Sequence, residues 1–340
     1  MNNNVRLVRT LLFKHTVLIF KNMVKFIQNI IWMLVATVLT TSCIKEDMDD
    51  CHNVTIYFQY LADGDKDVLY QYMSKVDLYV FDESGHILGV GSYNQDELTK
   101  FEAVPSFKLQ PGHRYKVVAV GNSYDHTEVV NYATETDFAN IYLQDPAWSD
   151  PDVPVTNHDY NYLGQKEFVM PDQVGVMYRD TVTLYSSHVK VDVEIHGLPA
   201  PDASRQDAGI PYLLSFENSN AQTSFENEVN LSEKGTIYPE LIYDNENKCY
   251  RTQNLALFRM DDTDGELSAD YCEHVMVLKE KNTGKELIRG NLYNYLVRNS
   301  DVIDVTKQEA ELPISVTFNS VGVSITVPQW YIENLTPDYD

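Results

Sequence analysis

Residues 76–90 read VDLYVFDESGHILGV, and this stretch decides the fold class. Two apolar runs rich in β-branched and aromatic residues flank the polar segment Asp82-Glu83-Ser84-Gly85. A strand, a short turn that contains glycine and a second strand together predict a β-hairpin. The same arrangement recurs at 275–288, where the turn is Lys281-Asn282-Thr283-Gly284.

Alternation of apolar and polar residues extends the β prediction along the chain. Near the start, every second residue is apolar and belongs to one predicted face: Val54, Ile56, Phe58 and Tyr60. The run 189–195 alternates valine and isoleucine with charged residues, as a half-buried strand does. Only a short helix is expected, over 67–75.

Many short strands at regular turn spacing predict an all-β fold of two tandem antiparallel β-sandwich domains. We expect the N-terminal β-sandwich over residues 53–180 and the C-terminal β-sandwich over 181–340. The stretch 122–166 is polar and acidic, with several prolines, and predicts long loops.

The N-terminal segment predicts a lipoprotein signal peptide over residues 1–42. An apolar run, Ile30–Leu39, is followed by small residues and then by Cys43. The run has about ten residues, and a helix needs ~20 to span a bilayer. We therefore expect removal of residues 1–42, acylation of Cys43 and a lipidated tether over 43–52. Two acyl chains hold a protein durably on a membrane.

The leader is long for a signal peptide, and Met23 is an alternative start of translation. Residues 11–20 form a second apolar stretch, but Lys14, His15 and Thr16 interrupt it, which argues against an upstream membrane segment.

The charge balance of the chain argues against nucleic-acid binding. The chain has 26 basic and 50 acidic residues, and the leader holds five basic and no acidic ones. The mature chain would carry 21 basic against 50 acidic residues, a net charge of −29. Such a surface repels phosphate backbones. Solubility at a crowded cell surface is the simpler explanation of the acidity, and recognition of a ligand through acidic groups is the alternative.

The chain has four cysteines, which limits the disulfides and redox sites that it can form. If Cys43 carries lipid, three others remain, namely Cys51, Cys249 and Cys272. Cys249 and Cys272 lie at the ends of strand-like segments, so a disulfide between them is possible in an oxidising compartment. No CxxC pair or histidine–cysteine cluster occurs, so the sequence predicts no zinc or redox site.

The most specific internal motif is Leu109-Gln110-Pro111-Gly112-His113-Arg114-Tyr115-Lys116-Val117-Val118-Ala119-Val120-Gly121-Asn122. Pro-Gly sets a tight turn, and we expect the tyrosine at the start of the following strand to pack at the sandwich corner. The pattern resembles the first sandwich of the FimB-like family of fimbrial anchor lipoproteins of Bacteroidetes type V pili. Val120 departs from that family, where tryptophan is common, and so does Ser187-His188, where arginine often precedes the long strand.

The resemblance continues at both ends of the mature chain. Cys43-Ile44-Lys45-Glu46-Asp47-Met48-Asp49-Asp50-Cys51 resembles the lipidated start of the family, and Ser324–Trp330 resembles its closing strand and tryptophan. Lys45-Glu46-Asp47 resembles an acidic signal that sends lipoproteins to the outer face of the outer membrane, with a plain solvated tether as the alternative.

The resemblance implies transthyretin-like sandwiches and a structural role without cofactor or catalysis. It implies a pilus anchor fixed by lipid to the cell outer membrane, with fimbrial stalk subunits as partners. The resemblance also implies polymerisation by strand donation, after an arginine-specific protease removes the N-terminal strand of a stalk subunit. No arginine lies between Cys43 and Arg114, so such a protease has nowhere to cut before the first strand.

The candidate donor strand lies at the C-terminus, where apolar residues alternate with small ones. We expect one apolar face along this strand, made of Val321, Val323, Ile325 and Val327. Such a strand can be donated to a partner, or it can close the second sandwich of its own molecule.

Other functions find little support in the sequence. The acidic stretches 63–67 and 261–266 suggest calcium loops, but the first lacks an acid at its twelfth position, Ser74, and solvated turns explain both. No GxSxG, HExxH or phosphate-binding glycine loop occurs, so we expect no enzyme. The alternative function is a glycan-binding surface lipoprotein, because the 23 tyrosines include candidates for stacking on sugars.

Overall fold

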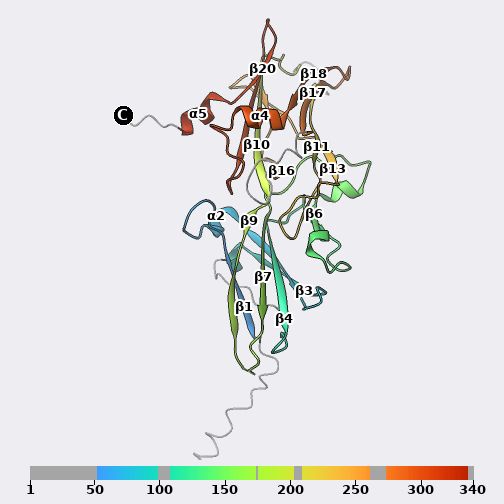
Figure 1. The fold of residues 1–340 in the computed structure, drawn as a ribbon. Coiled ribbons are helices and arrows are strands. Elements are labelled where there is room, and N and C mark those ends of the chain that lie inside the picture. The colour runs from blue at the N-terminus through green and yellow to red at the C-terminus, as the bar shows by residue number, and fades with distance from the viewer. Residues whose placement is uncertain (1–51, 99–107, 174, 203–208, 261–272, 336–340) are drawn as a thin grey trace, which may run out of the picture. The chain divides into compact units, whose positions relative to one another are not determined.

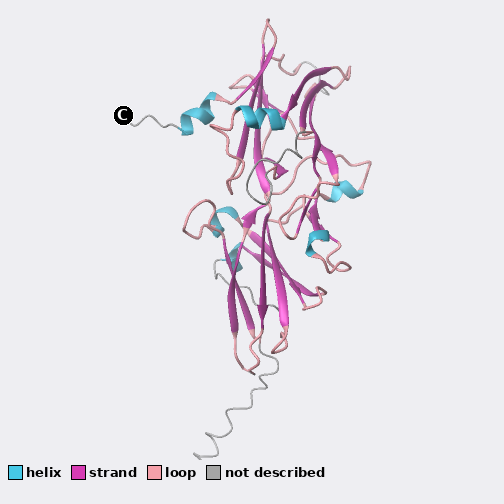
Figure 2. Ribbon diagram, in the orientation of Figure 1, coloured by secondary structure: helices cyan, strands magenta, loops and turns pink. Residues whose placement is uncertain are grey.

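The computed structural model describes residues 52–335 except 99–107, 174, 203–208 and 261–272. From His52 onward the chain forms one compact unit. It is built mainly of strands in several sheets (Figures 1 and 2), which confirms the all-β prediction. None of the described helices is long and apolar enough to cross a membrane.

Three sheets are built mainly from the N-terminal half of the chain. The largest has the order β3 (Ile87–Asn94), β2 (Lys75–Phe81), β4 (Arg114–Gly121), β7 (Tyr162–Val169) and β9 (Tyr185–Ser186). A two-stranded sheet consists of β1 (Val54–Gln59) and β8 (Tyr178–Thr183). A small third sheet has the order β12 (Gln222–Ser224), β6 (Tyr142–Gln144) and β5 (Glu128–Val130).

Two sheets are built from the C-terminal half. One has the order β14 (Ile242–Asp244), β15 (Cys249–Arg251), β10 (His188–His196), β19 (Glu311–Phe318) and β20 (Val323–Thr326), and β16 (Leu255–Phe258) also pairs with β10. The other has the order β13 (Lys234–Ile237), β11 (Tyr212–Asn220), β17 (Val275–Glu280) and β18 (Glu286–Asn291).

Helices are short throughout the described chain. The α-helices are α2 (Leu69–Tyr72), α3 (Gln95–Leu98), α4 (Leu292–Arg298) and α5 (Gln329–Leu335), and the 3₁₀ turns are η2 (Phe138–Asn140) and η3 (Pro146–Ser149). The short helix expected over 67–75 is confirmed by α2. The expected closing strand is also present as β20, and Trp330 lies in α5 just beyond it.

Both predicted hairpins are confirmed: β2 pairs with β3, and β17 pairs with β18, each antiparallel. Local pairing across a short turn explains why sequence alone was enough for them. Two pairs in the described chain are parallel, however: β1 with β8 and β10 with β19. Their partners are far apart in sequence, so no turn signal could reveal them.

Three apolar cores stabilise these layers. The first fills the space between the β1–β8 sheet and one face of the large N-terminal sheet, with Ile56, Val182 and Val117 among its buried residues. A second lies between the two C-terminal sheets. The third covers the other face of the large N-terminal sheet and includes Phe225 and Phe258 from the second half of the chain. The two halves therefore share buried apolar surface.

The structure differs from the prediction of long loops over 122–166. This stretch contains β5, β6 and the start of β7, and β6 pairs with β12 across 78 residues or more of sequence. Strands of three residues are too short to show alternation, which is why the sequence missed them. The predicted boundary at residue 180 falls inside β8, and the chain changes sheet between Ser186 and His188.

Candidate functional site: the terminal strands and a buried polar cluster

The predicted lipidation site and one member of the predicted cysteine pair lie outside the described residues. Cys43 and most of the tether lie outside the described residues, as do Cys272 and the acidic stretch 261–266. Cys249 is buried at the start of β15. A bond between Cys249 and Cys272 stays a prediction.

The candidate donor strand is paired within its own molecule. β20 pairs antiparallel with β19, from Phe318 opposite Val323 to Ser315 opposite Thr326, and stands at the end of the sheet order. Among the described residues, no strand pairs with its other edge. A strand edge with free N–H and C=O groups is a template for another strand.

The four apolar residues predicted for this strand divide into two groups. Ile325 and Val327 pack against the core of the C-terminal half. Val323 is 42% exposed and Val321 is 95% exposed, in the turn before β20. The strand therefore contributes apolar surface to its own sheet with one end and offers apolar surface to solvent with the other.

The N-terminal strand β1 is buried in place. Val54 and Ile56 are fully buried and Phe58 is nearly so, as their alternation predicted. Asn53 fastens the start of the strand, because its side-chain amide donates to the Leu109 carbonyl at 2.7 Å and its side-chain oxygen accepts from the Leu109 N–H at 3.0 Å. The start of β1 is thus bonded to the Pro-Gly motif.

The Pro-Gly motif has the geometry that its sequence predicted. Gly112 has φ = +74°, a value that favours glycine, and its N–H donates to the Met170 carbonyl. The Tyr115 ring is buried, and its hydroxyl accepts a hydrogen bond from the Gln110 N–H at 2.9 Å. The expected tyrosine contact at the sandwich corner is confirmed.

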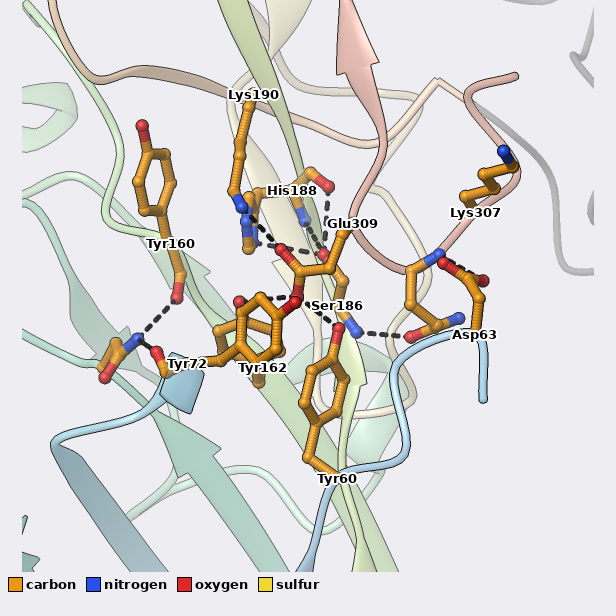
Figure 3. Close-up of polar contacts among 12 residues, drawn as sticks. Tyr60, Asp63, Tyr72, Tyr160, Tyr162, Ser186, His188, Lys190, Lys307 and Glu309 are labelled. Carbon is orange, nitrogen blue, oxygen red and sulfur yellow. Dashed lines mark hydrogen bonds and ion pairs between the residues drawn. The ribbon is translucent and has the colours of Figure 1, made fainter. Parts of the chain in front are cut away.

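A cluster of tyrosine, lysine and glutamate side chains joins β1, β7 and β10 to the segment that precedes β19 (Figure 3). Its centre is Glu309, whose side chain is 16% exposed. One carboxylate oxygen accepts hydrogen bonds from the hydroxyls of Tyr60, which directly follows β1, and of Tyr162, at 2.9 Å for the latter. The other oxygen accepts from the Lys190 ammonium at 2.6 Å. Charge-assisted bonds of this kind are stronger than neutral ones.

Aromatic rings enclose this ion pair. The Lys190 ammonium lies 5.6 Å from the ring centroids of both Tyr72 and Tyr160, within cation–π range. The rings of Tyr60 and Tyr162 meet edge to face, with centroids 4.8 Å apart.

Backbone contacts reinforce the cluster on either side. The Gln308 N–H donates to the Asp63 carboxylate at 3.0 Å, and the Gln308 side chain accepts from the Ser186 N–H at 2.8 Å. The Asp67 carboxylate accepts from the Tyr60 N–H. Asp63 and Asp67 of the stretch 63–67 therefore accept hydrogen bonds from backbone N–H groups. Among the described residues, no group of three potential ligands is placed to hold a metal ion.

Burial controls the protonation of the cluster. Burial, together with the neighbouring Glu309 carboxylate, raises the pKa of the Tyr60 and Tyr162 hydroxyls, so both remain protonated donors. Burial also lowers the pKa of His188 to about 3, because a charged imidazolium would be poorly solvated beside Lys190. His188 is therefore neutral, and its ring stacks on Tyr160 with centroids 4.9 Å apart.

Sequence reasoning missed this cluster. Tyr60 was expected on the apolar face of β1, but Glu309 lies in an irregular segment with no motif, 249 residues further along the chain. No local signal pairs these two residues.

A shallow cavity of about 280 Å³ lies beside the cluster, over β10 and β19. Its lining includes the aromatic rings of Tyr160 and Trp330 and the carboxylate of Asp192. Nothing in these groups forms a nucleophile with an adjacent base.

Several solved structures have a similar fold. A candidate adhesin from Bacteroides ovatus has 18% identity and a TM-score of 0.60, covering 84% of this chain and 96% of that one. A candidate polysaccharide-binding protein from Bacteroides thetaiotaomicron has 16% identity and a TM-score of 0.59, covering 82% and 96%. The fimbrial anchor protein Mfa2 from Porphyromonas gingivalis has 16% identity and a TM-score of 0.56, covering 81% and 96%. At these identities the likeness shows a shared all-β fold.

The family model of the Fimbrillin-A associated anchor proteins Mfa1 and Mfa2 matches residues 48–336. This match spans most of the chain, which therefore belongs to that family. The resemblance to fimbrial anchors stated from the sequence motifs is confirmed. The chain is a fimbria-associated structural protein. Among curated proteins, no sequence relative matches the chain.

Proposed function

We propose that this chain is the lipid-anchored base subunit of a cell-surface pilus. It attaches fimbrial stalk subunits to the cell outer membrane through β-strand donation, with acylated Cys43 as the fixed point and residues 43–52 as the tether ahead of two sandwiches. The observation that carries the proposal is the family match over residues 48–336.

Two further observations support the proposal. No arginine lies between Cys43 and Arg114, so an arginine-specific protease would leave β1 and the lipid in place. Among the described residues, no strand pairs with the outer edge of β20, and apolar side chains are exposed at Val323 and at Val321 just before it, which suits a strand that engages a partner.

Replacement of the acylated cysteine tests the anchor. In cells producing Cys43→Ala, we expect the protein and its pili in the medium instead of the membrane fraction, because the side chain that carries the lipid is gone. Cys51→Ala is the matched control and should remain in the membrane fraction with wild-type pili. Retention of Cys43→Ala in the membrane would contradict lipid anchoring.

A second candidate function is glycan binding, favoured by the cavity beside β10 and β19. Tyr160 and Trp330 provide rings on which a sugar can stack, and Asp192 provides a hydrogen-bond acceptor. Binding of the purified protein to a glycan array, abolished in Trp330→Ala and accompanied by normal pili in a deletion strain, would favour this function over anchoring.

A further inference from the structure

The strand β1 occupies a place where a strand from another chain would fit. It is one of only two strands in its described sheet, it pairs with β8 alone, and its six residues are in continuous parallel register. Strands held along a single edge are the ones that exchange most readily, since fewer ladder bonds must break. Burial of Val54, Ile56 and Phe58 holds β1 against the core, and contacts at the two ends of the strand add to this hold.

The two ends of β1 are held by different parts of the protein. The start is held within the same half of the chain, by the paired hydrogen bonds between Asn53 and Leu109. The end is held by the segment that enters β19, through the Tyr60 hydroxyl on Glu309 and the Asp63 carboxylate on the Gln308 N–H. The second half of the chain thus fastens the first strand.

Glu309 is the side chain on which this fastening depends. Its carboxylate is largely buried and takes donors from three separate elements, namely Tyr60 after β1, Tyr162 in β7 and Lys190 in β10. A buried carboxylate that has its donors is stable, whereas a lysine left without its carboxylate in an aromatic surrounding is costly. The cluster therefore favours one arrangement, with Tyr60 and β1 in place.

We propose that Glu309 is a lock on β1, which holds this strand beside β8 and so keeps the slot closed to a strand from a second chain. The biological role of the lock rests on the proposed function, because in an anchor β1 is the strand that connects the tether to the folded part of the chain. With the slot closed, the chain engages partners at β20 and accepts no strand at β1.

Amide hydrogen exchange on the purified protein tests the lock. In Glu309→Gln, we expect the Val54–Gln59 amides to exchange at least tenfold faster than in the wild type, since the loss of one charge-assisted bond changes an opening equilibrium by about that factor. The amides of β4 should stay protected. The matched control is Glu311→Gln, the same change two residues further on, at an exposed side chain. It should leave β1 exchange unchanged.

Binding of a strand peptide to the purified protein is a second test of the lock. A labelled peptide that copies residues 53–61 serves as the incoming strand. We expect Glu309→Gln to capture this peptide and the wild type and Glu311→Gln to exclude it. Tyr60→Phe removes one donor and keeps the ring, so it should accelerate β1 exchange even if Glu309→Gln does not fold.

If the β1 amides of folded Glu309→Gln exchange at the wild-type rate, the lock is overturned. Where Glu309→Gln does not fold, a wild-type rate in Tyr60→Phe overturns it. Equal capture of the peptide by the wild type would overturn it too. Neither result bears on anchoring, because both are measured on purified protein without pili. Loss of anchoring is detected instead by the location of Cys43→Ala in cells.

Discussion

Replacing Val323 or Ile325 with aspartate separates the two roles of strand β20. Ile325 packs against the C-terminal core, and a Cβ built on Gly290 in β18 would lie only 2.8 Å from its Cδ1 atom. Val323 is 42% exposed and lies two pairs further toward the turn. The new carboxylate is therefore placed against the core in Ile325→Asp and mostly in solvent in Val323→Asp.

The expected costs follow from these surroundings. Aspartate in a strand costs about 1 kcal/mol in either position. Full burial of an isoleucine is worth about 1.5–3 kcal/mol, so removal of the half-buried Ile325 side chain adds roughly 1–2 kcal/mol. At about 2–4 °C per kcal/mol, we expect Tm to fall by about 2–4 °C for Val323→Asp and by about 4–12 °C for Ile325→Asp. A fully buried apolar face of four residues would have predicted similar large losses for both.

Thermal unfolding and copurification with stalk subunits measure the two roles together. If the exposed end of β20 engages the partner, Val323→Asp should remain folded and lipidated and yet copurify with no stalk subunit. Ser324→Asp is the matched control, since it places the same charge in the same strand on the opposite face. It should keep the partner.

Two outcomes would refute this reasoning. Equal loss of Tm in Val323→Asp and Ile325→Asp would mean that the whole strand belongs to the protein's own core. Normal copurification of Val323→Asp would mean that the stalk binds elsewhere, and the donor assignment would have to be dropped.

Two further predictions concern stability. Burial lowers the pKa of His158 to about 3, below an unfolded value near 6.5, so its stabilising neutral form is lost as pH falls through this window. At pH 4.5 the free energy of unfolding is therefore lower by about 2–3 kcal/mol than at pH 7. Among the described residues neither ring nitrogen of His158 has a hydrogen-bond partner, and the ring packs on Phe258. His158→Phe should therefore lose less Tm between pH 7 and 4.5 than the wild type does. Equal losses of Tm in the two proteins would contradict this. Tyr115→Phe removes the hydroxyl that accepts from Gln110, and urea unfolding should show a loss of about 1 kcal/mol. The control Tyr142→Phe removes only an exposed bond and should show no loss, and equal effects would count against the corner contact.

Local patterns in the sequence were sufficient for much of the fold. The hairpins at 76–90 and 275–288 pair through turns of a few residues, so their signals lie in one window. The buried face of β1 follows from alternation alone, as does the long strand β10. The tyrosine of the Pro-Gly motif was also placed correctly, since its partner is five residues away.

What the sequence could not predict depends on contacts between distant segments. The parallel pairs of β1 with β8 and of β10 with β19 join segments more than a hundred residues apart, with no connecting turn to mark them. The exposure of Val323 was hidden for a related reason. Alternation identifies which residues share a face, but only the positions of β18 and β19 decide how much of that face is covered.

The lock at Glu309 gains its importance from its position between the two terminal strands. Glu309 lies two residues before β19, and β19 is the strand that holds β20. On the other side, the Glu309 carboxylate holds Tyr60 at the end of β1, whose start continues toward the tether. In a pilus anchor, tension would enter through the tether at β1 and leave through a partner at β20. Among the described residues, the Glu309 carboxylate is one of the contacts that join these two strands, so its buried bonds with three donors would share this load.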